Sequence, residues 1–230
     1  VFRVRGGRRH SYGLQCNGTL AGVTGVDLAP LEREHRWLKA FRSGVPAGPW
    51  QATWSEDTVE TTLHLLSPGD RAVVADAPGW RSSKGTDLNA APIQQAFLER
   101  EAAGEGPLES CFVAVIASRQ AGGKPLQSVR LLPSEPAGSV AVEVVSDAGT
   151  DVLLMSPDGT PCRSGEVALE GRFGMVRRPA DGPPSLALVD GVRLTAGSAV
   201  LSLDQAPAAA RDEQVHISFQ AHQLLGALAR

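Results

Sequence analysis

Short runs that alternate apolar and polar residues dominate the chain. Residues 214–219 place Val215, Ile217 and Phe219 on one face, and residues 139–145 do the same with three valines. Because successive side chains of a strand point to opposite faces, such runs predict half-buried β-strands. By the same pattern we expect strands at residues 1–5, 11–16, 50–54, 59–66, 71–75, 93–99, 110–118, 128–132, 151–155, 165–170, 173–177, 185–189 and 199–203.

Turn-forming residues separate these runs at close intervals. Examples are Gly122-Gly123 and the Pro157-Asp158-Gly159 stretch. About fifteen short strands at this spacing predict an all-β fold, a large antiparallel two-sheet sandwich of the supersandwich kind with few short helices. Residues 31–41 have a helical spacing of apolar side chains, which fits a short helix but also a loop or a strand, and residues 220–230 are similarly ambiguous.

Length and composition limit the organisation of the chain. Its 230 residues suit one large domain or two small ones, and the Pro- and Ser-containing stretch 133–138 is the best internal boundary. A hydrophobic fraction of 42% with 20% charged residues indicates a chain that buries a core. The chain begins with Val1 inside a predicted strand, so we expect it to be one piece of a longer protein.

Charge and hydropathy exclude two classes of function. A formal net charge of −3 argues against a bulk binder of nucleic acid or of anionic membranes. The longest apolar run, residues 111–117, is far shorter than the roughly 18–20 residues of a membrane span. The three cysteines are widely separated and lack metal-binding or redox spacing, so no disulfide framework is predicted.

Three side chains with useful chemistry follow a double glycine near the N-terminus. Arg8, His10 and Tyr12 alternate along a predicted strand and would therefore share one face. A guanidinium suits carboxylate or sulfate recognition, whereas imidazole and phenol suit proton transfer or metal ligation. The alternative is a polar strand face that meets water.

Two further residues extend the list of candidates. His64 lies in an otherwise apolar strand, where a histidine is usually buried and hydrogen-bonded, and Asp27 lies among apolar residues. His10, Asp27 and His64 from separate strands would suit a divalent ion, with Zn²⁺ the first candidate. The other histidines, His35, His216 and His222, lie in segments expected to face solvent.

The order of several motifs resembles one family of enzymes. Residues 1–12, Val-Phe-Arg-Val-Arg-Gly-Gly-Arg-Arg-His-Ser-Tyr, resemble the start of the β-sandwich domain of heparinase II/III-like polysaccharide lyases, which reads Phe-Arg-Val-x-Gly-Gly-x-x-His-Asp-Tyr. Stretches similar to the family follow in the same order up to about residue 132. They are Trp-Gln-Ala-Thr-Trp at 50–54, Leu-His-Leu-Leu at 63–66, and the segments 77–80, 97–100, 110–116 and 128–132.

The resemblance implies an activity and a missing partner domain. Such enzymes cleave uronic-acid-containing polysaccharides, glycosaminoglycan or alginate-like, by β-elimination: a base removes the C5 proton, the carboxylate charge is neutralised, and an acid protonates the leaving oxygen. In the family the principal catalytic residues come from an N-terminal α/α-toroid, which this chain lacks. The isolated chain is therefore expected to be inactive as a lyase. A periplasmic or secreted location is implied by the resemblance alone.

The resemblance also implies roles for individual residues. His10, Asp27 and His64 take the places of a structural divalent-metal site, with Zn²⁺ as the expected ion. Arg8 and Tyr12 would point toward substrate. His10 and Tyr12 are alternatively catalytic residues of the cleft, and the two roles of His10 stay open.

Two departures and one alternative complete the expectations. Ser11 replaces the family's usual Asp, and Gln15 stands where many members have a second His. If that second His is catalytic in the relatives, we expect weakened or redirected chemistry in this protein. The alternative is a non-catalytic carbohydrate-binding or structural sandwich. In that case exposed Trp50, Trp54 and Trp80 would stack on sugar rings, and Trp50 is the candidate substrate contact.

Overall fold

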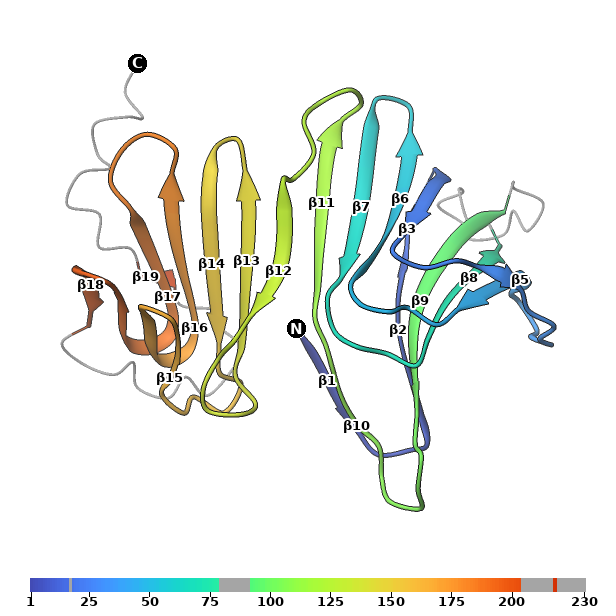
Figure 1. Ribbon diagram of the computed structural model, residues 1–230, viewed down its shortest axis with the longest axis horizontal. Coiled ribbons are helices and arrows are strands. Elements are labelled where there is room, and N and C mark those ends of the chain that lie inside the picture. The colour runs from blue at the N-terminus through green and yellow to red at the C-terminus, as the bar shows by residue number, and fades with distance from the viewer. Residues whose placement is uncertain (17, 79–91, 204–216, 219–230) are drawn as a thin grey trace. The chain divides into compact units, whose positions relative to one another are not determined.

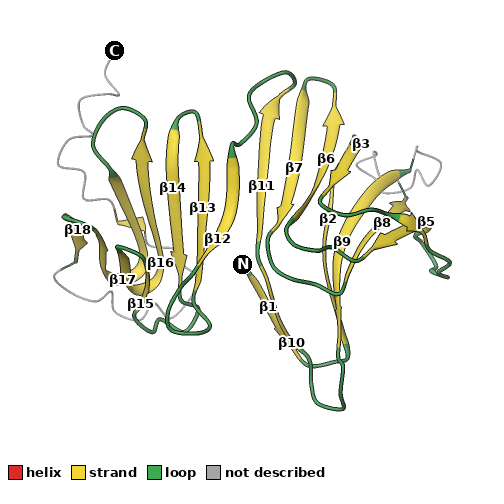
Figure 2. Cartoon of the chain, viewed as in Figure 1, coloured by secondary structure: helices red, strands yellow, loops and turns green. Residues whose placement is uncertain are grey.

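The fold is all-β and antiparallel, as the sequence predicts. The computed structural model describes residues 1–16, 18–78, 92–203 and 217–218, and it contains strands, turns and loops but no helix within these ranges (Figures 1 and 2). The few short helices of the prediction are therefore not found in the described part. The chain divides into two compact units, Val1–Pro125 and Leu126–Arg230, so the segment 133–138 lies inside the second unit. The described residues hold no helix long and apolar enough to cross a membrane.

Two sheets and a ribbon build the first unit. The β6 sheet has the strand order β11 (Ala114–Gln120), β7 (Val59–Leu65), β6 (Trp50–Glu56) and β3 (Thr19–Thr24). The β9 sheet has the order β2 (Arg9–Gln15), β9 (Ile93–Glu101), β8 (Arg71–Ala77), β5 (Lys39–Gly44) and β4 (Ala29–Pro30). A ribbon of β1 (Phe2–Arg5) and β10 (Glu109–Phe112) completes the unit (Figure 1).

The core of the first unit lies between its two sheets. Trp50 and Trp54 of β6 are each 1% exposed, and they share a cluster with Leu63 and Leu65 of β7. Leu98 of β9 belongs to the same cluster, together with Ala72, Val74 and Ala96 of the β9 sheet. Burial alternates clearly along β6, where Trp50, Ala52 and Trp54 are buried, whereas β8 is buried on both faces from Ala72 to Ala75.

The segment 31–41 is the loop of a hairpin and not a helix. Strands β4 and β5 pair antiparallel, and the Leu31 amide donates to the Phe41 carbonyl at 2.8 Å, a contact that no helix spanning these residues allows. Leu31, Leu38 and Phe41 pack instead on Val73 and Ala75. The apolar side chains that suggested a helix thus cover the outer face of the β9 sheet.

The second unit is one large antiparallel sheet that bends. Its order is β12 (Ser128–Leu132), β13 (Val140–Ser146), β14 (Gly149–Met155), β16 (Val167–Pro179), β17 (Ser185–Ala196) and β18 (Ala199–Ser202). Strand β15 (Cys162–Ser164) also pairs with β16, and β19 (Ile217–Ser218) also pairs with β17. The sequence predicts two strands where the structure has the single long β16.

A glycine pair allows β16 and β17 to bend together. Gly171 and Gly191 face each other across the two strands at a bulge, and a Cβ on Gly171 would lie 2.4 Å from the Gly191 Cα. Before the bulge Val167 and Leu169 are buried, and after it the buried side changes by one residue to Gly174 and Val176. The extra residue of the bulge, Val192, is on β17, and the bend that a bulge gives to a strand pair lets both halves of β16 reach the same core.

Candidate functional site

The predicted face of Arg8, His10 and Tyr12 is divided in the structure. Arg8 precedes β2, is exposed, and donates from Nη1 to the Gly104 carbonyl at 2.9 Å. His10 and Tyr12 lie on the inward side of β2, with Leu14. The three side chains therefore do not form one solvent-facing surface.

Both ring nitrogens of His10 have protein partners. Nδ1 lies 2.8 Å from the Ser110 hydroxyl, and Nε2 contacts the Gly6 carbonyl. A carbonyl oxygen only accepts, so in the neutral ring Nε2–H donates to Gly6 and Nδ1 accepts from Ser110. His10 is 7% exposed and ties the β1–β2 turn to β10, which leaves neither nitrogen available to a metal or a substrate proton.

Tyr12 is part of an aromatic cluster at the same place. Its ring centroid lies 5.7 Å from that of Phe112 and 6.1 Å from that of Phe2. The three rings come from β2, β10 and β1, at separations typical of favourable aromatic pairs. The ring of Tyr12 therefore joins three strands.

Trp50 and His64 are also buried. Trp50 is in the core and its Nε1 has no hydrogen-bond partner, so the predicted stacking on a sugar does not occur in this structure, and Trp54 is equally buried. Trp80 lies outside the described residues. His64 is on the face of β7 opposite Leu63 and Leu65, and burial lowers the pKa of its imidazole.

The predicted metal ligands do not converge. Asp27 is exposed on the β3–β4 connection, His64 is buried on the outer face of β7, and His10 is engaged by Ser110 and Gly6. In the part of the chain that the structure describes, no group of three or more His, Cys, Asp or Glu side chains is placed to hold a metal ion. The donor set predicted for Zn²⁺ thus does not fit this arrangement.

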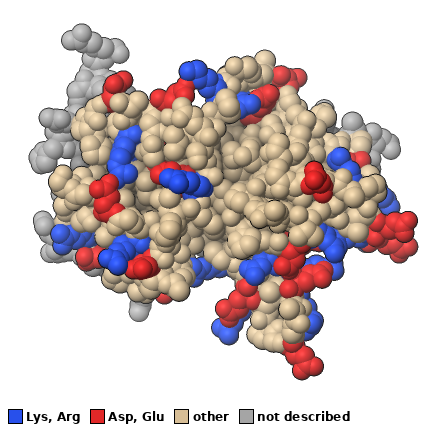
Figure 3. Space-filling view, viewed as in Figure 1, with Lys and Arg blue, Asp and Glu red and all other residues tan. Residues whose placement is uncertain are grey.

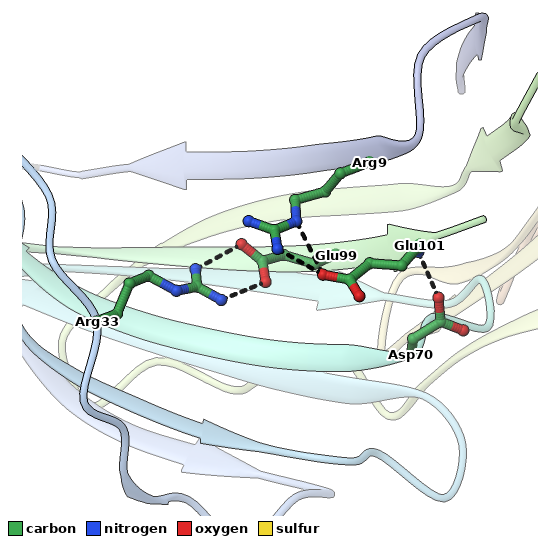
Figure 4. A network of polar contacts seen from close by, with 5 residues as sticks. All are labelled: Arg9, Arg33, Asp70, Glu99 and Glu101. Atoms are coloured by element: carbon green, nitrogen blue, oxygen red, sulfur yellow. Dashed lines mark hydrogen bonds and ion pairs between the residues drawn. The ribbon is translucent and has the colours of Figure 1, made fainter. Parts of the chain in front are cut away.

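A buried ion pair fixes the β4–β5 hairpin to the β9 sheet. Both terminal nitrogens of Arg33 contact the Glu99 carboxylate, at 2.8 and 2.9 Å, and this hydrogen bonding raises the pKa of Arg33 (Figure 4). Glu101 accepts from Arg9, and the Glu101 amide donates to Asp70 at 2.6 Å (Figure 4). Each polar group in this network is engaged by another.

Surface arginines of the first unit are commonly paired as well. The ion pairs Arg5–Glu109, Arg9–Glu101 and Arg119–Glu60 join neighbouring strands. Figure 3 shows positive and negative side chains interspersed on the visible face. The paired arginines are a poor basis for anion binding, because a ligand would have to displace a carboxylate from each of them.

A surface hollow beside β3 has a different character. It has a volume of about 440 Å³ and is lined by residues 20–23 of β3, residues 26–28 of the following connection and Arg42 of β5. We call it the β3 hollow. It brings Asp27, one of the predicted site residues, together with a guanidinium.

Irregular backbone builds the β3 hollow. The pairing of β3 with β6 shifts by one residue between Leu20 and Gly22, which marks a bulge on an edge strand. The Gln94 side chain accepts from the Leu20 amide at 3.2 Å and donates to Asp76 at 3.1 Å, which anchors the bulge to the β9 sheet.

The β3–β4 connection, which carries Asp27, lies close to β5, which carries Arg42. A Cβ on Gly44 would lie 2.1 Å from the Asp27 carbonyl oxygen, so only glycine lets the connection lie against β5. Arg42 is two residues before Gly44 on the same strand and lines the hollow from that side. Gly44 thus lets the connection that carries Asp27 lie against the strand that carries Arg42.

The two charges of the β3 hollow do not neutralise each other. Asp27 and Arg42 are both exposed, and neither forms a hydrogen bond or ion pair with any side chain in the described ranges. An acceptor and a fork of donors are therefore available on one small surface. This arrangement suits a ligand that carries both hydroxyl groups and an anionic group.

The sequence offered only part of this site. Asp27 was a candidate, but no strand was expected at residues 19–24, and Arg42 was not singled out. The available signal is Leu20 and Val23, two apolar residues three apart on a short strand. Side chains on one face of a regular strand are two residues apart, so inward-facing residues three apart indicate a bulge.

The comparisons with known proteins leave the family open. The chain matches no protein-family model and no curated protein. The resemblance to heparinase II/III-like lyases therefore rests on the collinear motifs alone.

Proposed function

We propose that this chain is the sandwich portion of a polysaccharide lyase that cleaves uronic-acid-containing glycans by β-elimination. In this proposal an N-terminal α/α-toroid supplies the principal base and acid. The sandwich supports that domain and contacts the acidic polysaccharide.

One observation carries the proposal. The residues that define the family motif depend on one another: Gly6 accepts from His10, His10 reaches Ser110, and the ring of Tyr12 packs on that of Phe2 in a tilted pair. Residues that hold one local fold together in this way are expected to recur in proteins that share that fold. This supports the view that the collinear motifs reflect membership in the family.

The geometry also supports a division of labour. Removal of a C5 proton needs a base that can reach it and a cation that stabilises the developing charge. His10 and Tyr12 are directed inward, and the nitrogens of His10 are hydrogen-bonded. The contribution left to the described residues is to bind and orient the glycan.

A lyase assay tests the proposal. The chain alone and the chain joined to the toroid domain are incubated with alginate, heparin and heparan sulfate, and the ultraviolet absorbance of the unsaturated uronate product is followed. We expect product only from the joined protein. Turnover by the chain alone would place the base and acid here, and no turnover of any of these glycans by the joined protein would contradict the lyase assignment.

A second candidate is a glycan-binding sandwich without a catalytic partner. The charges of Asp27 and Arg42 in the β3 hollow favour it, because they are available to a ligand without any further domain. Glycan affinity of the chain together with no turnover by the joined protein would select this function.

A further inference from the structure

We propose that the β3 hollow binds a uronate residue of an acidic glycan, with Arg42 on the carboxylate and Asp27 on the hydroxyl groups. The choice of ligand rests on the proposed function, whereas the site itself is argued from the hollow. No motif of the sequence resemblance includes Arg42 or residues 20–23.

Charge complementarity is the first argument. Arg42 and Asp27 line the same hollow, and no ion pair joins them. Opposite charges that share a hollow without meeting leave room for a molecule between them. A guanidinium binds a carboxylate through two parallel hydrogen bonds, and a carboxylate accepts from vicinal hydroxyls, so a uronate offers a partner to each.

The lining of the hollow is the second argument. Leu20, Val23, Val26 and Leu28 are half-buried because they pack on the core of the first unit, so the accessible surface of the hollow is more polar than apolar. The hydroxyl groups of a sugar ring suit such a surface, since a few placed polar groups fix the orientation of a ligand in its site. Gly22 adds space: a Cβ there would meet no atom within 4 Å.

An extended peptide is the competing occupant. Strand β3 ends the order of its sheet, and an edge strand can pair with an added strand. The bulge between Leu20 and Gly22 interrupts the regular ladder that such pairing needs. The geometry therefore favours a compact, hydroxylated ligand over a strand.

Titration calorimetry on the full 230-residue chain tests the inference. The probes are an alginate oligosaccharide, which carries carboxylate only, its carboxyl-reduced form, dextran sulfate oligosaccharide, which carries sulfate only, and an extended peptide with alternating apolar residues. The variants are Arg42→Ala and Gly22→Leu. Arg193→Ala, which changes an exposed arginine of the second unit, is the matched control.

We expect alginate to bind and its carboxyl-reduced form to bind at least tenfold more weakly. Loss of the Arg42 hydrogen bonds should raise the Kd about tenfold. Gly22→Leu should abolish binding because its side chain fills the hollow, while the Arg193→Ala control keeps wild-type affinity. Circular dichroism checks that each variant is folded.

Several results overturn the inference. Unchanged alginate affinity of Arg42→Ala and Gly22→Leu would place binding elsewhere. Equal affinity for dextran sulfate would replace uronate by a general anion, and binding of the peptide alone would identify an edge-strand partner. Turnover by the joined protein with an unaffected Arg42→Ala variant would refute this site and leave the proposed function standing. Binding in the hollow together with no turnover by the joined protein would refute the proposed function and leave this site standing.

Discussion

The motif around His10 and the β3 hollow lie in the same unit but use their polar groups differently. Around His10 the chemically capable side chains contact one another: the imidazole is held by Gly6 and Ser110, and the Tyr12 ring is stacked. In the hollow, Asp27 and Arg42 form no hydrogen bond or ion pair with each other or with any other described side chain. Residue type alone therefore does not identify a site, because what matters is the hydrogen-bonding capacity that folding leaves available.

The comparison predicts that engaged groups control stability, whereas the groups of the hollow control binding. The largest expected effect is at Glu99. Glu99→Ala leaves the mostly buried Arg33 without its carboxylate and should lower the free energy of unfolding by about 2–3 kcal/mol. Urea denaturation measures the change. The double variant Arg33→Ala/Glu99→Ala should lose less than the sum of the single changes, and strict additivity would contradict the coupling.

His10 should follow closely. His10→Ala removes two hydrogen bonds and leaves the Ser110 hydroxyl and the Gly6 carbonyl without their partner, at a cost of about 2 kcal/mol in urea denaturation. His10→Gln keeps a donor and should lose less. A His10→Ala variant as stable as the wild type would show that this histidine is not structural.

A matched pair of glycines tests how the hollow is built. Gly44→Ala would bring a Cβ against the Asp27 carbonyl and should cost about 1–3 kcal/mol. Gly22→Ala places its methyl group in open space and should change the free energy of unfolding by less than about 0.5 kcal/mol. Thermal denaturation of the two variants should therefore separate them, and equal melting temperatures would contradict the geometry.

His64 gives a smaller effect that depends on pH. Burial lowers the pKa of its imidazole from 6.5, so the unfolded chain binds the proton more readily than the folded chain. The contribution to stability is therefore complete above pH 6.5 and declines as the pH falls through that value. The difference in unfolding free energy between wild type and His64→Gln, measured from pH 8 to pH 5, should change with this sign. A difference that is constant with pH would refute it.

The smallest expected effect on stability is at Arg42. The side chain is exposed and has no ion-pair partner in the described ranges, so Arg42→Ala should change the free energy of unfolding by less than about 0.5 kcal/mol. Urea denaturation is again the measurement. A loss above 1 kcal/mol would show that Arg42 supports the fold as the paired arginines do.

Alternation explains why much of the fold could be predicted. Strands such as β6 and β9 lie within a residue or two of their predicted positions, because one face of each is buried in a continuous core. The spacing of apolar residues in 31–41 suggests a helix, but the segment is a hairpin loop, because apolar side chains that cover a sheet from a loop can show the same spacing. Bulges such as that of β3 break the alternation and hide the strand.

The site was harder to predict for a physical reason. Alternation correctly predicts that His10 and Tyr12 share one face of β2, but it does not tell whether that face meets solvent or the core. Arg42 and Asp27 line one hollow only because Gly44 lets the β3–β4 connection lie against β5 of the other sheet. Such long-range packing has no local signature in the sequence.

The most direct test compares the alginate-oligosaccharide affinities of His10→Gln and Arg42→Ala by calorimetry under conditions where both variants are folded. The account predicts wild-type affinity for His10→Gln and about tenfold weaker binding for Arg42→Ala. Weak binding by His10→Gln together with unchanged binding by Arg42→Ala would contradict it and return the ligand to the motif at residues 1–12.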